Sequence, residues 1–522
     1  MRVVCQFSQL TQHFNARPIF SNLSASLQQG LTGLIGRSGQ GKSVLLSLLA
    51  QQFPASAGSI RWSAPFYYVP QLERLQGGRL ADALGIGVLY DSWQRIEQGQ
   101  GEADDFSQME GSWHLPAFWE QELKAAGLAL PLSASLEQLS GGEQTRLALC
   151  RAFALTDHYL LLDEPSNHLD TQGRQWLLDK LKQHPAGALI ATHDRRLLEQ
   201  VERILELDQH GLHDYGGNYA LYQTIHTQQL AATEQQVAQL KQHEKQQQRE
   251  QQASLEKALQ RRQRGEQYRR SGSQSALLLD ARKNRAETSL GKLKQQQQQL
   301  SEQLKQELTT TQARLETIKP QTLRFAPQLA PQSLCLHLAE LQLPYVRTQP
   351  ISLNLYKGER WHIQGQNGSG KSTLLKVIAG LETASSGYCE VHGTCVYLDQ
   401  HFSLLAAQTS ALANLQRLHP NLSETRLRTE LAGLRLRGEK ALQPIHTLSG
   451  GERLKVALLA VMIGETAPAL LLLDEPDNHL DLDSRLLLEQ TLAEYTGALM
   501  VVSHDLAFVE QLKLTQRLDL SH

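Results

Sequence analysis

The chain has 522 residues, which is enough for two or three domains with full cores. A net charge of −2 excludes a wholly basic nucleic-acid binder, so any such surface is local. The first residues have no signal-peptide pattern, and no apolar run reaches the ~18–20 residues of a membrane span. The five cysteines lack zinc or cluster spacing, so we expect reduced thiols in a cytoplasmic protein.

Residues 1–222 alternate strand-like and helical patterns, which predicts an α/β domain. Within it, GRSGQGKS (36–43) follows an apolar run at 31–35 and precedes a helical pattern. Glycines let backbone N–H groups close around phosphate oxygens, and the helix N-terminus adds positive partial charge. We therefore expect Lys42 to reach the β- and γ-phosphates of a nucleotide and Ser43 to place its hydroxyl on Mg²⁺. The other predicted ATP-binding residues of this loop are Gly36, Arg37, Ser38, Gly39, Gln40 and Gly41.

Candidate catalytic residues follow this loop in the first half. Gln71 ends a strand-like run and is expected to coordinate Mg²⁺ or water. In LLLDEPSNHLD (160–170), Asp163 ends an apolar run and is expected to hold Mg²⁺. The next residue, Glu164, is expected to polarise the attacking water as general base. His193, in IATHD, is interpreted as a switch that senses the γ-phosphate and orients the water.

The middle zone, residues 223–322, is rich in Gln, Lys, Arg and Glu. The runs at 241–252 and 294–308 lack proline and predict an antiparallel hairpin of two long helices joined near 270–275, with disordered low complexity as the alternative. Between 257 and 294, eleven Lys and Arg residues stand against three acids. Such a cluster suits phosphates, although a solvated helix face is the other interpretation. The predicted RNA contacts are Arg261, Arg262, Arg264, Arg269, Arg270, Arg282, Lys283 and Arg285.

Residues 323–522 repeat the motif order of the first half, which indicates a duplicated domain. In the second loop, GQNGSGKS, the predicted ATP-binding residues are Gly365, Gln366, Asn367, Gly368, Ser369, Gly370, Lys371 and Ser372. Gln400, Glu475 and His504 are the predicted catalytic residues of this half. The predicted Mg²⁺ ligands of the whole chain are Ser43, Gln71, Asp163, Ser372, Gln400 and Asp474.

These motifs in this order resemble the ATP-binding-cassette ATPase family, and LSGGE (139–143 and 448–452) is the specific addition over other phosphate-loop proteins. The resemblance implies two α/β ATPase domains, each with a helical subdomain, joined by a long helical hairpin linker. It implies that LSGGE contacts ATP held by the opposite cassette. The implied signature residues are Ser140, Gly141, Gly142, Glu143, Ser449, Gly450, Gly451 and Glu452.

By the same resemblance, the two ATP sites are composite. Lys42 then faces Ser449, and Lys371 faces Ser140. Both halves keep the glutamate and the histidine, so both sites are expected to hydrolyse ATP. The aromatic residues that map to the adenine-stacking position of the family are Phe14 and Tyr345.

The DEPxNHLD form, the charged linker and the YGGNYALYQ entry (215–223) resemble the ABC-F branch, as does SALLLDARKNRAETSLGKL (275–293). This likeness implies a monomeric ATPase whose linker enters the ribosome and contacts ribosomal RNA or transfer RNA, mainly through phosphates. It implies either a translation factor or a protein that gives resistance to ribosome-targeting antibiotics. The alternative function is the energy-coupling ATPase subunit of a membrane transporter with separate transmembrane partners.

The first half has about 20 residues more than the second between the strand-ending glutamine and LSGGE, including the acidic stretch 98–106. Family members with an arm subdomain carry a longer, basic helical hairpin at this place. We therefore expect little or no arm.

Overall fold

The computed structural model describes most of the chain, namely residues 2–14, 17–71, 78–167, 169–270, 295–296, 298–316, 319, 321, 323, 333–346, 349–365, 368–464, 466–477 and 480–520. It forms two compact units. One unit joins Met1–Ala220 with Gln321–His522, and the other is Leu221–Pro320. The domain boundaries expected at 222 and 322 stay predictions.

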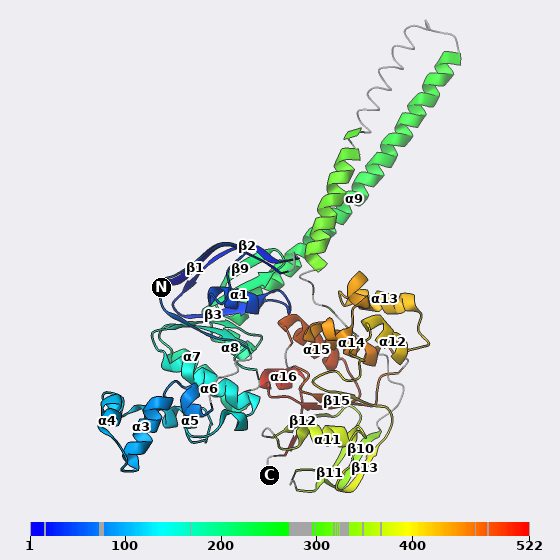
Figure 1. Cartoon of the computed structure of the whole chain (residues 1–522). Helices are drawn as coiled ribbons and strands as arrows, with labels where there is room; N and C mark the ends of the chain where they lie inside the picture. Colours follow the sequence, from blue (N-terminus) through cyan, green and yellow to red (C-terminus); the bar gives the residue numbers. More distant parts are fainter. Residues whose placement is uncertain are drawn as a thin grey trace. The chain divides into compact units, whose positions relative to one another are not determined.

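The first cassette, which Figure 1 draws in blue to teal, is built on a six-stranded sheet. The order of its strands is β5-β6-β7-β3-β8-β9. All neighbours are parallel except β8 and β9. The strands are β3 (Leu31–Ile35), β5 (Phe66–Val69), β6 (Tyr159–Asp163), β7 (Ala188–Ala191), β8 (Arg203–Asp208) and β9 (Gly211–Gly216). An antiparallel sheet, β2-β1-β4, consists of β1 (Val3–Phe14), β2 (Arg17–Gln28) and β4 (Ala57–Trp62). The carboxyl ends of the parallel strands meet at one edge, which is where ligands bind such sheets.

The second cassette repeats this plan with a five-stranded parallel sheet, β14-β15-β16-β12-β17. Its strands are β12 (Arg360–Gln364), β14 (Cys395–Leu398), β15 (Leu470–Asp474), β16 (Ala498–Val502) and β17 (Gln516–Asp519). The antiparallel sheet β11-β10-β13 consists of β10 (Leu334–Gln342), β11 (Ile351–Tyr356) and β13 (Ser386–Val391). The α/β fold class with two cassettes is therefore as predicted.

Helices cover both parallel sheets, and their apolar faces form the cores. In the first cassette these are α1 (Lys42–Leu49), α6 (Gly141–Ala154), α7 (Thr171–Gln183) and α8 (Arg195–Glu199). In the second they are α11 (Lys371–Ile378), α14 (Gly450–Met462), α15 (Leu482–Ala493) and α16 (Leu506–Gln511). The strands β6, β7, β15 and β16 are buried along their whole length, because helices pack on both faces.

A helical subdomain lies between β5 and α6, and a smaller one between β14 and α14. The first contains α2 (Leu80–Ala83), α3 (Gly87–Glu97), α4 (Ala103–Met109), α5 (Leu115–Ala125) and η1 (Leu136–Gln138). The second contains α12 (Ala411–Leu418), α13 (Glu424–Gly433), η2 (Gly438–Leu442) and η3 (Ile445–Thr447).

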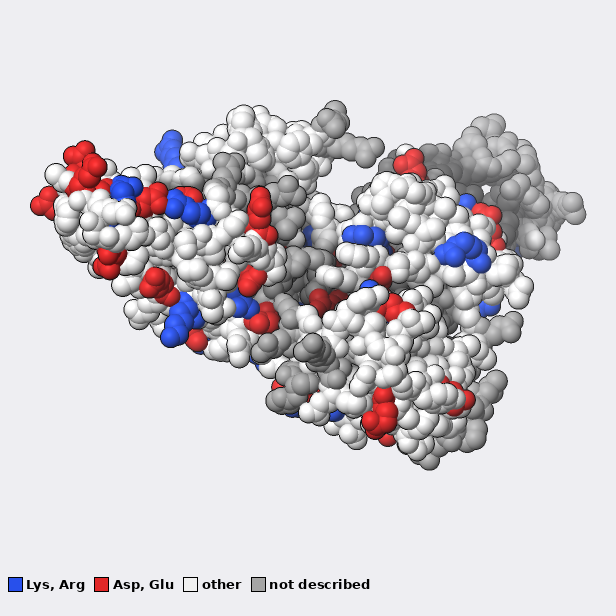
Figure 2. Space-filling model, turned by 60° about the horizontal axis from the view of Figure 1, so that its bottom comes forward, with Lys and Arg blue, Asp and Glu red and all other residues white. Residues whose placement is uncertain are grey.

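The acidic stretch of the first half contributes to the short helix α4, which an ion pair between Arg95 and Asp105 joins to α3. Figure 2 shows acidic side chains gathered at the left end of the molecule, where Figure 1 draws α3 and α4. No Lys or Arg occurs between Glu97 and Glu122. The expectation of little or no arm stays a prediction.

The unit Leu221–Pro320 consists mainly of α9 (Tyr219–Arg270), a helix of 52 residues, and a helical stretch over 298–316. Lys319, just beyond that stretch, pairs with Glu234 near the start of α9 at 3.3 Å, so the chain runs out and back as the hairpin prediction requires. Both Gln-rich runs are helical where they are described. The expected junction at 271–275 lies outside the described residues. Within the part of the chain that is described, no helix combines the length and apolarity of a membrane span.

Candidate functional site

Each predicted phosphate loop connects a parallel strand to a helix. The first lies between β3 and α1, and the second lies between β12 and α11. The residues that precede the helices, Gly41 and Gly370, have φ of 93° and 94°, which side-chain-bearing residues rarely adopt. A Cβ on Gly41 would also lie 2.5 Å from the Ile19 side chain. Glycine is therefore required where the loop enters the helix.

The two loop lysines are held inside their own loops. Lys42 Nζ donates to the Gly36 carbonyl at 2.7 Å and to the Arg37 carbonyl at 3.4 Å. Lys371 Nζ donates to the Gly365 carbonyl at 2.8 Å. Burial lowers the pKa of both lysines, and the carboxylates near them oppose that shift. Both ammonium groups thus lie at a helix N-terminus, which is a favourable place for a phosphate.

The other predicted loop residues differ in where they lie. Ser38, Gly39 and Ser43 line the first site's pocket with Lys42, while Gly365 and Gly368 line the second site's pocket with Lys371. Gln366 and Asn367 lie outside the described residues. Residues of the loops that line neither pocket include Arg37 and Gln40, whose side-chain Oε1 accepts from the Arg37 N–H at 2.9 Å.

The Asp-Glu pairs end the two central buried strands. Asp163 is the last residue of β6, and burial raises the pKa of its carboxyl, against a hydrogen bond from Ser43. Glu164 and Glu475 follow the strands with φ of 50° and 47°, in the left-handed region. Burial raises the pKa of Glu164 to about 8, and the charge of Lys42 opposes that increase. A carboxylate with a pKa raised in this way accepts a proton more readily near neutral pH.

Each predicted switch histidine faces the glutamate of its own cassette. His193 Nε2 lies 3.4 Å from Glu164 Oε1, and His504 Nε2 lies 3.6 Å from Glu475 Oε1. Burial lowers the pKa of His193 well below its usual value, and lowers that of His504 to about 4. Both imidazoles are therefore neutral near pH 7, so in each ring one nitrogen donates a hydrogen bond and the other accepts one.

The predicted glutamines and aromatic residues are placed less uniformly. Gln71 lines the first pocket, whereas Gln400 is half-buried and is not among the described residues that line either pocket. The Phe14 ring lies 6.0 Å from the Phe53 ring, and Tyr345 is 96% exposed. Neither Phe14 nor Tyr345 is among those lining residues. Their adenine-stacking role stays a prediction.

The LSGGE motifs form the N-termini of α6 and α14. Ser140 caps α6 by accepting from the Glu143 N–H, and Glu143 in turn accepts from the Ser140 N–H at 2.8 Å. Ser449 and Glu452 repeat the arrangement at α14. Serine followed three residues later by glutamate is a capping box, so the motif also has a local structural reason.

The second site's pocket has a volume of about 920 Å³, more than twice the first site's volume of about 340 Å³. Ser140, Gly142 and Glu143 of the first cassette line it together with Lys371 and His504 of the second. The structure thus brings a signature motif and a phosphate loop from opposite cassettes to one cavity. Asp170 at the end of the first NHLD string lines the same pocket.

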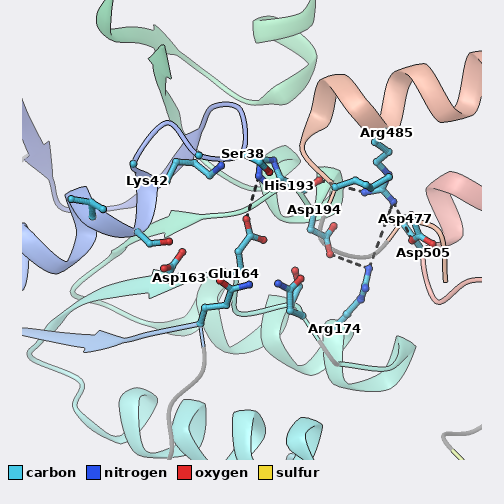
Figure 3. A pocket seen from close by; sticks show the side chains of 18 of the residues that line it. Ser38, Lys42, Asp163, Glu164, Arg174, His193, Asp194, Asp477, Arg485 and Asp505 are labelled. Atoms are coloured by element: carbon cyan, nitrogen blue, oxygen red, sulfur yellow. Dashed lines mark hydrogen bonds and ion pairs between the residues drawn. The ribbon is translucent and has the colours of Figure 1, made fainter. Parts of the chain in front are cut away.

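The first site's pocket is lined from the opposite cassette by other residues (Figure 3). Lys42, Asp163, Glu164 and His193 lie on the first-cassette side. The second cassette contributes Asp477, Leu480, Arg485 and Asp505. Ser449 is not among the described residues that line this pocket, so the structure does not place the expected partner of Lys42 there.

Sequence reasoning missed the charged residues around the first site. Arg174 Nη1 lies 3.5 Å from Asp194 and 3.6 Å from Asp505, and Arg485 pairs with Asp505. The Ser38 N–H donates to Asp481 Oδ2 at 2.9 Å. A signal was present: an arginine follows NHLD at the same offset in both repeats, and an aspartate follows each switch histidine.

Comparison with known families agrees with this geometry. A family model described as ABC transporter matches residues 20–167 and 348–478, which together are more than half of the chain. These segments are the two cassettes up to their Asp-Glu strands.

Relatives extend the similarity through the linker. The probable ATP-binding protein YheS of Escherichia coli K12 is 32% identical over 96% of this chain and 76% of its own length. The ribosome protection protein VmlR of Bacillus subtilis strain 168 is 27% identical, over 98% and 86%. The energy-dependent translational throttle protein EttA of Mycobacterium tuberculosis is 29% identical, over 77% and 66%.

Among solved structures, the complex of the archaeal ribosomal stalk protein aP1 with the archaeal ribosome recycling factor aABCE1 is similar, with a TM-score of 0.53. The match covers 97% of this chain and 86% of that one at 16% identity. At this identity the likeness shows the fold alone, which is that of tandem cassettes.

Proposed function

The chain belongs to the ABC-F family of ATP-binding-cassette ATPases and hydrolyses ATP, and on this premise we propose that it acts on the ribosome. The supporting observation is that similarity to VmlR, a ribosome protection protein, runs through 98% of the chain and so includes the helical linker. The proposed role is that of a translation factor or of a ribosome-protecting resistance protein.

The transporter alternative has weaker support. The family model described as ABC transporter matches the cassettes at 20–167 and 348–478, and the linker lies outside both segments. A role on the ribosome accounts for the linker, which this chain carries in addition to its two cassettes. We propose a cytoplasmic monomer in which the two cassettes of one chain bind ATP between them.

In each proposed site, the loop residues bind the phosphates and the Asp-Glu pair prepares hydrolysis. Glu164 and Glu475 take the proton of the attacking water. His193 and His504, each of which lies beside the glutamate of its own cassette, orient that water. Gln71 and Gln400 are proposed to contact the water or the cation. Closure of the cassettes on ATP and release after hydrolysis would then drive a binding cycle.

The described donors fit a magnesium ion. Asp163 accepts a hydrogen bond from Ser43, and within the described residues the buried Asp474 Oδ1 has no hydrogen-bond partner. Mg²⁺ at a nucleotide is bound chiefly by phosphates, water and one or two protein oxygens, which is what these side chains offer. Ser43, Asp163, Ser372 and Asp474 would hold the ion, which would neutralise charge on the phosphates.

The linker is proposed to contact RNA through its basic part. Arg264 is exposed on α9. Arg261, Arg262, Arg269 and Arg270 belong to the same helix, although their side chains are not among those described. The other three predicted contacts, Arg282, Lys283 and Arg285, lie outside the described residues. Lys and Arg side chains that neutralise phosphates would make binding strongly dependent on salt.

The proposal is tested by trapping the ATP-bound state on ribosomes. The variant Glu164→Gln with Glu475→Gln keeps the phosphate loops but loses both bases, so we expect it to stay bound to ribosomes during sedimentation with ATP and to stop cell-free protein synthesis. In the same variant, the arginines of the linker are also replaced by glutamine. The replaced residues are Arg261, Arg262, Arg264, Arg269 and Arg270. This change should weaken binding to ribosomes and make it less dependent on salt.

The matched control is Lys42→Ala with Lys371→Ala, which lacks the phosphate-contacting ammonium groups and should not be retained. If the glutamine variant sediments with ribosomes no more than this control, and protein synthesis continues, the ribosome is not the partner.

A further inference from the structure

A network of buried charges lies beside the first nucleotide site, where the two cassettes of the compact unit meet. Its cations are Arg174, Arg195 and Arg485, and its anions are Asp194, Asp477, Glu489 and Asp505. All of these residues except Arg174 are at most 9% exposed. Buried charges are costly unless paired, so the contacts within this network restrict how the cassettes can separate.

The strongest contact across the network joins α8 of the first cassette to α15 of the second. Arg195 donates to Glu489 twice, from Nη1 to Oε1 at 2.9 Å and from Nη2 to Oε2 at 3.0 Å. This two-bond geometry is the strong form of an arginine–carboxylate pair. Arg195 is 9% exposed and Glu489 is 8% exposed, so water screens the pair little.

The pair is connected to the catalytic histidine of the first site. Arg195 follows His193 by two residues, on the segment that carries Asp194. Arg485, 3.7 Å from Glu489 Oε1, also donates from Nη1 to the His193 carbonyl at 3.4 Å. The second cassette therefore holds the backbone of His193 and the segment after it. The His193 ring is the one that lies 3.4 Å from Glu164.

The second site cannot make an equivalent pair. Counted from the switch histidines, Leu506 has the place of Arg195 in the repeat, and counted from the NHLD strings, Leu178 has the place of Glu489. A second contact between the cassettes, at the surface beside the first phosphate loop, is also one-sided. Arg37 Nε pairs with Asp483 at 2.7 Å, whereas Gln172 has the place of Asp483 in the other repeat.

We propose that Arg195 and Glu489 form a one-sided clamp that keeps the first nucleotide site closed longer than the second. Arg195 is a positioning residue, because it acts through the His193 segment and through α15 rather than by touching ATP. The first site's cavity, about 340 Å³ against about 920 Å³ for the second, is lined by Asp477, Arg485 and Asp505 of the same charged network.

The test measures how fast each site loses ATP. In the hydrolysis-deficient chain (Glu164→Gln with Glu475→Gln), Lys371→Ala leaves the first site to bind and Lys42→Ala leaves the second. Fluorescent ATP is bound with Mg²⁺ and chased with unlabelled ATP. We expect Arg195→Gln to accelerate release from the first site by roughly tenfold, a common size for coupling between sites, and to change release from the second less than twofold.

Two further variants separate the clamp from a general loss of structure. Arg196→Gln removes the neighbouring charge on the same helix and should leave both release rates unchanged. Exchanging the charges (Arg195→Glu with Glu489→Arg) should restore part of the slow release. If Arg195→Gln does not fold, Arg195→Lys keeps the charge without the two-bond geometry, and it should accelerate release from the first site by less than about tenfold.

The proposal is overturned if the Arg195 variants change both sites equally, or neither. It is also overturned if the exchanged pair releases ATP from the first site as fast as Arg195→Gln does. Because no ribosome enters the assay, these outcomes are independent of the function proposed above.

Discussion

The two nucleotide sites of this chain share their motifs but differ in what the opposite cassette brings to them. The second pocket is lined by the first cassette's LSGGE residues, whereas the first is lined from the second cassette by Asp477, Leu480, Arg485 and Asp505. The repeats also differ beside their switch histidines, where one has Arg195 and the other has Leu506. Duplicated motifs therefore conserve the chemistry that each loop offers, while flanking residues decide how the two halves meet.

The NHLD aspartates show the same contrast at closer range. Asp481 accepts from the Ser38 N–H of the other cassette, and its pKa is lowered to about 2, with burial opposed by hydrogen bonds from Ser484 and Ser38. Asp170 is instead paired with Arg146 of its own cassette at 2.6 Å. One aspartate thus contacts the opposite phosphate loop, while its counterpart is bound to its own signature helix.

Loss of either phosphate-loop lysine is the largest change that we expect. Lys42→Ala and Lys371→Ala each remove a charge-assisted contact to phosphate, so turnover at the altered site should fall by about 10²–10³-fold, the usual effect of losing one such donor. ATPase rates with each site intact in turn measure this. The folded content should stay unchanged by circular dichroism, because the backbone carbonyls to which each ammonium donates belong to its own loop.

An equal loss of total turnover in both single variants would mean that the sites hydrolyse ATP together, despite their different surroundings. A loss confined to one half of the activity would mean that they act separately. The two variants therefore decide how far the structural contrast extends to catalysis.

Much of each site was predictable because it depends on short stretches of sequence. The phosphate loops, the strand-ending Asp163 and Asp474 and the LSGGE capping boxes are set by local backbone requirements. The contacts between cassettes were not predictable in the same way. Arg195 and Glu489 are separated by most of the chain, and in a sequence each is an ordinary charged residue in a helical segment. Only the fold shows that they meet and are buried.

A tyrosine on the strand beside each Asp-Glu pair provides a second, smaller contrast. The Tyr397 hydroxyl donates to Asp474 Oδ2 at 2.9 Å, whereas the Tyr68 hydroxyl lies 3.3 Å from Ser47 Oγ. Loss of a hydrogen-bond partner of a metal ligand typically changes the metal affinity by about 10–100-fold. Tyr397→Phe should therefore raise the Mg²⁺ concentration needed for turnover at the second site by about tenfold.

Tyr68→Phe is the matched control, and it should leave the Mg²⁺ requirement of the first site within about twofold. Titration of Mg²⁺ in chains that carry one functional site gives both values. Equal shifts in the two variants would show that the hydrogen bond to Asp474 does not distinguish the sites.

The smallest expected effect is a dependence of stability on pH that comes from His504. Burial, together with the charges of Lys371 and Arg174, lowers the pKa of His504 to about 4 in the folded chain. The unfolded chain binds a proton at an ordinary pKa near 6.5, so the free energy of unfolding falls as pH falls from about 7 toward 4. His504→Gln removes this contribution, and between pH 7 and 5.5 it should reduce the loss of stability by about 1 kcal/mol. Urea unfolding at both pH values measures it, with the exposed His401→Gln as control. An unchanged dependence in His504→Gln would mean that the imidazole takes up its proton in the folded chain as readily as in the unfolded one.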